Sequence, residues 1–200
     1  MALLDFFRPR PDGRAGAMTP PAAASTSPGK QRVAVILLTL STSGFTAWKA
    51  YEGFTGHAII PTKGDVPTIG YGNTYYEDGT RVRMGDTITR QRADQLAKNI
   101  LSQKERAFRA TIPGVALTQG EYDVYIDYTG QYGLGNWRKS SMRRELITGN
   151  YVGACRALLN WRFAGGYDCS TLVNGQPNKR CWGVWTRQLE RNRKCMEAQP

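Results

Sequence analysis

The chain has 200 residues, 40% of them hydrophobic, and its 27 Lys and Arg outnumber its 16 Asp and Glu to give a net charge of +11. This length and composition suit a globular protein with one sizeable core. The charge favours a polyanionic partner, such as nucleic acid, anionic lipid or a cell-wall polymer, with solubility alone as the alternative explanation. Four cysteines without a C-x-x-C pair, and a lone His57 far from them in sequence, argue against a zinc site. We expect no metal and no cofactor.

The N-terminal region divides into two segments. Residues 1–32 are rich in Pro, Ala and Arg and lack apolar periodicity, which predicts a flexible basic tail. Residues 33–48 carry no charge and follow Lys30 and Arg32. This run is shorter than the ~20 residues of a comfortable membrane helix, and its Ser, Thr and Gly residues make it only weakly hydrophobic. Its length suits a signal-peptide core, but no A-x-A cleavage motif stands before Lys49. We therefore predict an uncleaved signal-anchor segment, with a buried core helix as the alternative.

A glycine-rich ribbon begins at Glu52, in the stretch EGFTGHAIIPTKGDVPTIGYGNT. The β-branched residues between its glycines predict a small β lobe near residues 57–85. Most of the remaining chain has helical patterns, so we expect an α+β, mostly helical protein whose folded domain spans residues 49–200. Two unequal lobes usually leave a cleft between them, and clefts are where ligands bind.

Capping signals and helical periodicity follow the ribbon. Apolar side chains recur at helical spacing over residues 88–101, with Thr89 as a candidate N-cap. Thr118 and Glu121 form a capping-box pattern, and the helix that they open is predicted to end at the GLG of residues 133–135. Shorter helices are expected within residues 140–150 and 151–163. A basic amphipathic helix is expected within residues 182–195.

The cysteines Cys155, Cys169, Cys181 and Cys195 all lie in the last third of the chain. This clustering predicts two disulfides and an oxidising compartment. Three pairings are possible. We favour Cys169–Cys181, which closes a loop poor in helix formers, together with Cys155–Cys195, which ties two helices together. Four buried free thiols are the alternative.

Glu52 and Asp65 are candidate catalytic carboxylates. Glycoside cleavage uses two carboxyl groups, one protonated and one ionised. Glu52 ends an apolar helix and suits the acid, because partial burial raises the pKa of a carboxyl group. Asp65 lies in the polar turn KGDVPT and suits the ionised partner. Such a pair alone is a weak signal, since most acid pairs are solvated surface charges.

The wider pattern resembles the phage lysozyme (endolysin) family, glycoside hydrolase family 24. The matching stretches include YEGF, PTIGYGNT, GDTITRQRADQLAKNIL, LTQGEYDVYIDYTGQYGLGNWRKSSMRRELITGNY, ALLNWRFAGG and GVWTRQLERNRKC, spread over about residues 45–196. The resemblance implies a lysozyme-like fold, with a small β lobe and a larger helical lobe around a cleft. It also implies a muramidase that cleaves the β-1,4 bond between N-acetylmuramic acid and N-acetylglucosamine in peptidoglycan and lyses the host at phage release.

The resemblance places the family's catalytic Glu on Glu52 and its Thr on Thr68. The family's Asp normally stands six residues before that Thr, where this chain has Thr62. The ribbon is also one residue longer than the commonest spacing between Glu and Thr. We predict that Asp65, the nearest carboxylate, takes the role of that Asp.

Residues 33–48 resemble the segment that tethers signal-anchor-release endolysins to the host inner membrane from its periplasmic side. The resemblance implies later release into the periplasm, with peptidoglycan and the inner membrane as partners, no nucleic acid and a monomeric chain. Two alternatives remain. A lytic transglycosylase works with a single Glu and needs no partner Asp, and a non-catalytic basic module would bind the cell wall or nucleic acid through a decayed site.

Overall fold

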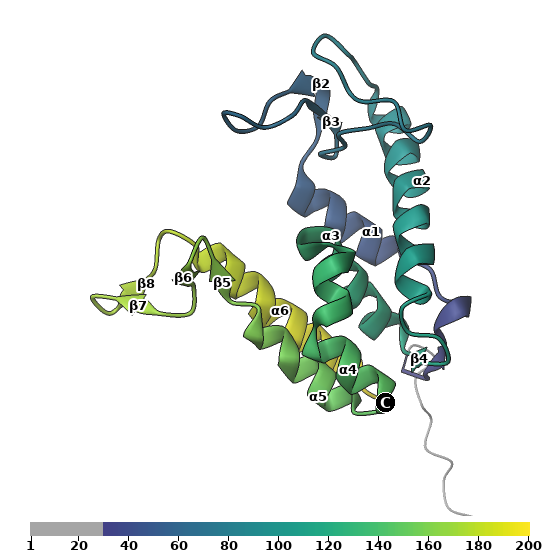
Figure 1. Ribbon diagram of the computed structural model, residues 1–200, viewed down its shortest axis with the longest axis vertical. Helices are drawn as coiled ribbons and strands as arrows, with labels where there is room; N and C mark the ends of the chain where they lie inside the picture. The colour runs from purple at the N-terminus through teal and green to yellow at the C-terminus, as the bar shows by residue number, and fades with distance from the viewer. Residues whose placement is uncertain (1–29) are drawn as a thin grey trace, which may run out of the picture.

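The computed structural model describes residues 30–200, so the predicted tail, residues 1–32, lies almost entirely outside the described residues. The protein has the predicted small β lobe and larger helical lobe (Figure 1). Helix α2, Arg90–Arg109, runs from one lobe to the other, and α1, Thr42–Glu52, ends where the β lobe begins. The β lobe contains the antiparallel hairpin of β2, Thr55–Ile59, and β3, Thr68–Gly70.

The helical lobe consists of α3, Gln119–Lys139, α4, Ser141–Ile147, α5, Tyr151–Ala157, and α6, Trp182–Glu197, with a 3₁₀ turn at Leu158–Asn160. Trp137 lies at the centre of its core, with ring centroids 4.9 Å from Phe108 and 5.3 Å from Tyr125. Its indole Nε1 donates a hydrogen bond of 2.8 Å to Thr111. The one polar atom of this buried side chain is therefore satisfied.

The predicted helix starts are confirmed. The side chain of Thr89 caps α2, and Thr118 and Glu121 form a complete capping box at the start of α3. The predicted end of that helix at residues 133–135 is wrong. Gly133 has φ 80° and kinks α3, but the helix resumes and continues to Lys139. Glycine tolerates this left-handed conformation, and burial of Trp137 beyond the kink favours the continuation.

Residues 33–48 do not form a single helix in this structure. Strand β1, Val33–Ala34, pairs antiparallel with β4, Ala116–Leu117, and a 3₁₀ turn follows at Val35–Leu37. Val35 and Leu38 are buried in the main core, and α1 begins only at Thr42. Over residues 30–200, no helix is both long and apolar enough to cross a membrane.

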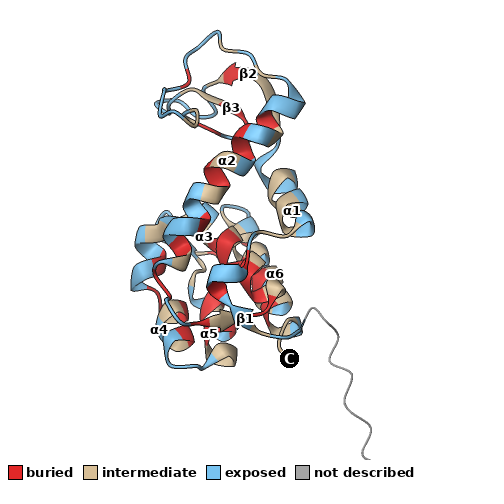
Figure 2. Ribbon diagram, turned by 90° about the vertical axis from the view of Figure 1, so that its right-hand side faces the viewer, coloured by how far each residue is buried: buried red, intermediate tan, exposed pale blue. Residues whose placement is uncertain are grey.

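Helix α1 has no fully buried residue, although Phe45 and Trp48 pack against the small apolar cluster around Tyr71 (Figure 2). Polar contacts fix its start. Asp123 of α3 accepts hydrogen bonds from the backbone N–H of Ser41, at 3.0 Å, and from the Ser41 hydroxyl. Glu105 of α2 accepts from the N–H of Leu40 at 2.6 Å. Gly44 packs so closely here that a Cβ atom would lie 2.9 Å from Cγ of Asp123. The carboxylates of Asp123 and Glu105, together with the close packing of Gly44 against Asp123, therefore position the first turn of α1.

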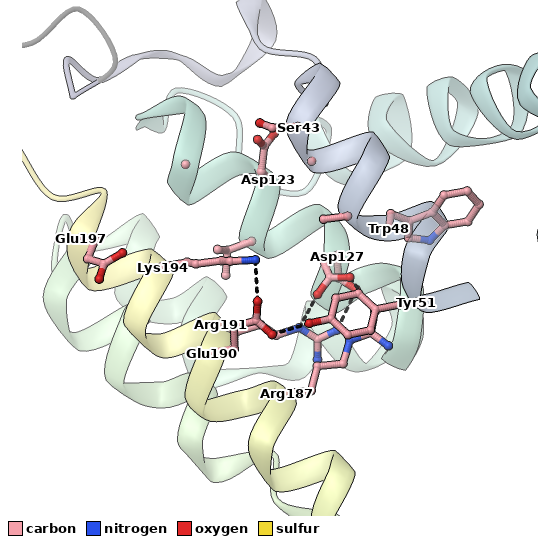
Figure 3. A pocket seen from close by; sticks show the side chains of 14 residues that line it. Ser43, Trp48, Tyr51, Asp123, Asp127, Arg187, Glu190, Arg191, Lys194 and Glu197 are labelled. Atoms are coloured by element: carbon pink, nitrogen blue, oxygen red, sulfur yellow. Dashed lines mark hydrogen bonds and ion pairs between the residues drawn. The ribbon is translucent and has the colours of Figure 1, made fainter. Parts of the chain in front are cut away.

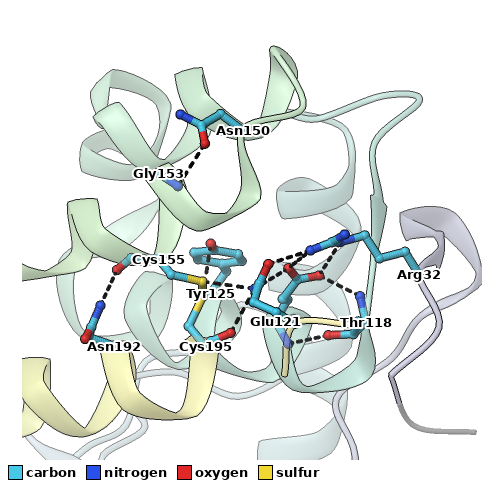
Figure 4. Close-up of a disulfide and its surroundings, with 10 residues drawn as sticks. Arg32, Thr118, Glu121, Tyr125, Asn150, Gly153, Cys155, Asn192 and Cys195 are labelled. Carbon is cyan, nitrogen blue, oxygen red and sulfur yellow. Dashed lines mark hydrogen bonds and ion pairs between the residues drawn. A yellow bond between two sulfur atoms is a disulfide. The ribbon is translucent and has the colours of Figure 1, made fainter. Parts of the chain in front are cut away.

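Both favoured disulfides are confirmed. Cys155–Cys195 joins α5 to α6, and Cys169–Cys181 joins two residues that are 12 positions apart in the sequence. The first lies near an ion pair in which Arg32 donates to the fully buried Glu121 at 2.8 and 3.1 Å (Figure 4). Since Glu121 also closes the capping box of α3, the residue just before β1 is tied to the centre of the helical lobe.

Residues 161–181, here named the disulfide arm, project from the helical lobe beside the N-terminus of α6 (Figure 1). The arm holds two short hairpins, β5–β6 (Phe163–Ala164 with Tyr167–Asp168) and β7–β8 (Leu172–Val173 with Gln176–Pro177). We did not predict these strands. Their turns, Gly165–Gly166 and Asn174–Gly175, have positive φ at both residues, which is the type I′ geometry of tight hairpins.

Candidate active site

Glu52 is the last residue of α1, at the junction of the two lobes. Gly53 ends the helix with φ 70°, and its N–H donates to the Lys49 carbonyl at 3.1 Å. We expected partial burial of Glu52, but the residue is exposed. The reason is that α1 has no fully buried residue and Glu52 is its last residue, where the chain turns toward β2. The carboxyl is therefore accessible to a large substrate.

The glycine turn after β3 lies against the Glu52 carboxyl. Gly72 has φ 76°, and a Cβ atom there would lie 3.6 Å from Glu52 Oε2. Gly70 has φ 65° and packs against α2, where its Cβ would come within 3.2 Å of the Ala93 methyl. Only glycine adopts these conformations without strain. The IGYG segment therefore forms a tight turn that brings backbone beside the candidate acid.

Thr68, Asp65 and Thr62 lie farther along the same hairpin. Thr68 pairs with Ile59, and its hydroxyl donates to the Ile59 carbonyl at 3.4 Å. Asp65 is exposed in the loop between β2 and β3, where its carboxylate accepts from the N–H of Val66 at 2.9 Å. The N–H of Asp65 donates to the carbonyl of Thr62 at 3.0 Å. The structure thus places the glycine turn next to Glu52, whereas no described hydrogen bond joins Glu52, Asp65 and Thr68.

A network of charged residues behind Glu52 fixes the end of α1 to α3 and α6 (Figure 3). The Tyr51 hydroxyl donates to the carboxylate of Glu190, and the Arg187 guanidinium lies 4.4 Å from the centre of the Tyr51 ring. Asp127 accepts from Arg187 at 2.7 Å and from Arg191 at 2.6 Å. These side chains line a pocket of about 300 Å³ between the three helices. Tyr51, the residue before Glu52, is therefore held by α6, and α6 is in turn bound to α3 through Asp127.

The electrostatics of this network keep its central carboxylate ionised. Burial raises the pKa of Asp127, but Arg191 and Arg187 outweigh that effect and leave the pKa below its usual value.

The supporting network was not found from the sequence. Arg187, Glu190, Arg191 and Lys194 recur at helical spacing on α6, which predicts a charged face but does not name its partners. Their contacts with Tyr51 and Asp127 depend on how three helices pack. Chemically, the arrangement presents one accessible carboxyl group on a fixed helix end, beside a backbone turn that a polymer can approach.

The fold is that of a lysozyme-like protein. It combines a small β hairpin with a helical lobe and places a carboxyl group on the helix end where the two lobes meet. The chain belongs to the phage lysozyme family, whose pattern matches residues 49–180. This is a family of glycosidase-type peptidoglycan hydrolases.

Individual relatives agree with that assignment. The endolysin of Salmonella phage P22 is 33% identical over 129 residues, which is 64% of this chain and 87% of the relative. The SAR-endolysin of Enterobacteria phage PA-2 is 27% identical over 139 residues, covering 68% and 81% of the two chains. Among solved structures, the endolysin of Escherichia coli O157:H7 phage FAHEc1 is similar with a TM-score of 0.65 and 26% identity, over 82% of this chain and 98% of that one.

Proposed function

We propose that the protein is an endo-acting muramidase that cleaves the β-1,4 bond between N-acetylmuramic acid and N-acetylglucosamine and lyses the host cell at phage release. The observation that carries this proposal is the position of Glu52, accessible at the end of α1 with Oε2 against the glycine turn. A glycan held along that turn has its glycosidic oxygen within reach of the Glu52 carboxyl, which protonates the leaving group as general acid.

Glu52→Gln tests the assignment, because it keeps the side-chain shape and removes the acid. We expect a loss of lysis of about 10²-fold or more, since a positioned general acid contributes about 10²–10⁴-fold in rate. Glu197→Gln, an exposed acid in an ion pair at the end of α6, is the matched control and should keep wild-type activity. Near-normal lysis by a folded Glu52→Gln protein would refute the proposal.

Asp65 and Thr68 are proposed to orient the attacking water or stabilise positive charge on the sugar. Asp65 lies in an exposed loop three residues before Thr68, where its carboxylate is accessible to a bound glycan. Asp65→Asn and Thr68→Val should each lower the turnover rate. A silent Asp65→Asn together with an impaired Thr62→Val would instead assign the role to the position six residues before Thr68.

A lytic transglycosylase is the second candidate, because no described contact joins Asp65 to Glu52. The two reactions differ in their products. A hydrolase leaves reducing ends, whereas a transglycosylase leaves 1,6-anhydromuramic ends. Mass spectrometry of the fragments released from purified sacculi decides between them.

We also propose that residues 33–48 first tether the enzyme to the periplasmic side of the inner membrane and then release it. Similarity to proteins named SAR-endolysins supports this, as does the low hydrophobicity of the segment. In the folded chain, Thr42 and Thr46 are exposed, so leucines there increase the affinity for the bilayer without disturbing packing. Thr42→Leu/Thr46→Leu should delay lysis and keep the protein in the membrane fraction, with the double serine variant as control. A periplasmic product that lacks residues 1–48 would refute the release step.

A further inference from the structure

The disulfide arm carries a groove that is separate from the glycine turn at Glu52. It has a volume of about 560 Å³ and lies between β6 and β8. Its lining includes two cations, two amides, an aromatic ring and an aliphatic side chain: Lys179, Arg180, Gln176, Asn178, Tyr167 and Val173. Tyr167 and Val173 are about half exposed, at 48% and 54%.

The charge of this groove is positive and lacks a counter-charge within the arm, all of which the structure describes. No residue that lines the groove is acidic. The one acid of the arm, Asp168, is already used, because it accepts from Arg162 at 3.0 Å and from the Ser170 hydroxyl at 2.6 Å. Arg180 lies 4.6 Å from the centre of the Tyr167 ring. The groove therefore offers cations beside a flat ring to a ligand that carries negative charge.

The groove is held in shape before any ligand binds. The Cys169–Cys181 disulfide links the segment after Tyr167 to the segment after Arg180, so the two walls cannot separate. At the base, Asn178 is 7% exposed, and its side chain accepts from the N–H of Arg180 at 3.1 Å. Its carbonyl accepts from the N–H of Trp182 at 2.9 Å, which fixes the arm to the start of α6. A preformed site loses less conformational entropy on binding.

The opposite face of the arm has a similar character. Phe163 pairs with Asp168, and Ala164 pairs with Tyr167, so Phe163 and Tyr167 point to opposite faces of the β5–β6 hairpin. Phe163 lines a second concavity of about 460 Å³, whose cations are Lys139 and Arg144. On each face of the hairpin an exposed aromatic ring thus lies in a concavity with two positive charges from neighbouring elements, which suits a polymer that lies across the arm.

We propose that the groove between β6 and β8 binds the carboxylate-bearing peptide of peptidoglycan while the glycan is at Glu52. This inference rests on the proposed function, because it names a second part of the same substrate. The peptide carries free carboxylates for Lys179 and Arg180, backbone amides for Gln176 and Asn178, and small methyl side chains for Tyr167 and Val173. A hydrogen bond between a cation and a carboxylate is stronger than a hydrogen bond between two neutral groups.

The test measures binding of the full-length Glu52→Gln protein to purified insoluble sacculi by co-sedimentation. Two substrates are compared: intact sacculi, and sacculi from which an amidase has removed the peptides. Lys179→Ala/Arg180→Ala is the groove variant. Arg106→Ala/Arg156→Ala removes the same charge from exposed positions on α2 and α5 and is the matched control. Anionic phosphatidylglycerol vesicles and single-stranded DNA serve as probes for the other polyanions.

We expect the groove variant to bind intact sacculi about three- to tenfold more weakly, as for two partly exposed charge pairs, and the control to bind like the parent. The difference should disappear on peptide-free glycan. An equal loss in the control, a loss that persists without peptides, or a loss seen only with vesicles or DNA would each overturn the inference. A wild-type protein that neither binds nor cleaves sacculi would instead refute the proposed function.

Discussion

Removal of the Asp123 carboxylate should loosen the helix that carries Glu52. Asp123→Ala deletes the acceptor of two hydrogen bonds from Ser41, at the start of a helix without a buried residue. A hydrogen bond to a charged group contributes about 1.5–3 kcal/mol, and Asp123 is only partly buried, so we expect a loss of about 2 kcal/mol for local opening of α1. That free energy corresponds to about a thirtyfold increase in the opening equilibrium.

Amide hydrogen exchange read out by mass spectrometry measures this opening directly. Peptides that cover residues 42–52 should exchange about thirtyfold faster in Asp123→Ala, while peptides from α4 and α5 should not change. Asp78→Ala is the control, since Asp78 also accepts from a backbone N–H, at 2.8 Å, but lies in a loop of the β lobe. Unchanged exchange of α1 in Asp123→Ala would refute the view that the contacts of Asp123 with Ser41 hold the start of this helix.

Other predictions concern stability. Replacing Cys155 and Cys195 by serine removes a cross-link over 40 residues and should lower the free energy of unfolding by about 4 kcal/mol, measured by chemical denaturation. Arg92 hydrogen-bonds Glu77 and lowers its pKa from 4.5 to about 2. Because the folded-state pKa is depressed, this stabilisation is present above pH 4.5 and is lost as the pH falls toward 2. Glu77→Gln should therefore cost about 1–2 kcal/mol at pH 7 after solvent screening, and the difference from wild type should vanish near pH 2. Gly70→Ala should destabilise the β lobe, seen as a lower melting temperature, because φ is 65° there and α2 leaves little room.

The parts of the fold that the sequence predicted are those set by local chemistry. Thr89 and the Thr118–Glu121 pair mark helix starts because their side chains bond the first free N–H groups of the same helix. The cysteine pairing followed from loop composition. The turns Gly165–Gly166 and Asn174–Gly175 also carry a local signal for tight hairpins, which the overall composition of the loop does not reveal.

The parts that were not predicted depend on contacts between distant segments. Whether residues 33–48 form a helix is decided by the pairing of β1 with β4 and by the burial of Val35 and Leu38. The exposure of Glu52 depends on which face of α1 packs against its neighbours, which helical periodicity does not report. The position of Asp65 relative to the glycan stays a prediction, because it depends on a loop that the substrate itself would contact.

The ion pair between Arg32 and Glu121 forms only when the segment before β1 and the helical lobe lie on the same side of the membrane. On the proposed pathway, Arg32 begins on the cytoplasmic side of the bilayer and the helical lobe on the periplasmic side. In that state Glu121 has no guanidinium partner, β4 has no neighbouring strand, and the core sites of Val35 and Leu38 are empty. Losing one partner of a buried charge pair alone costs about 3–5 kcal/mol. On that proposed pathway the tethered domain would be an unfinished fold, and the missing contacts would favour the release of residues 33–38 from the membrane.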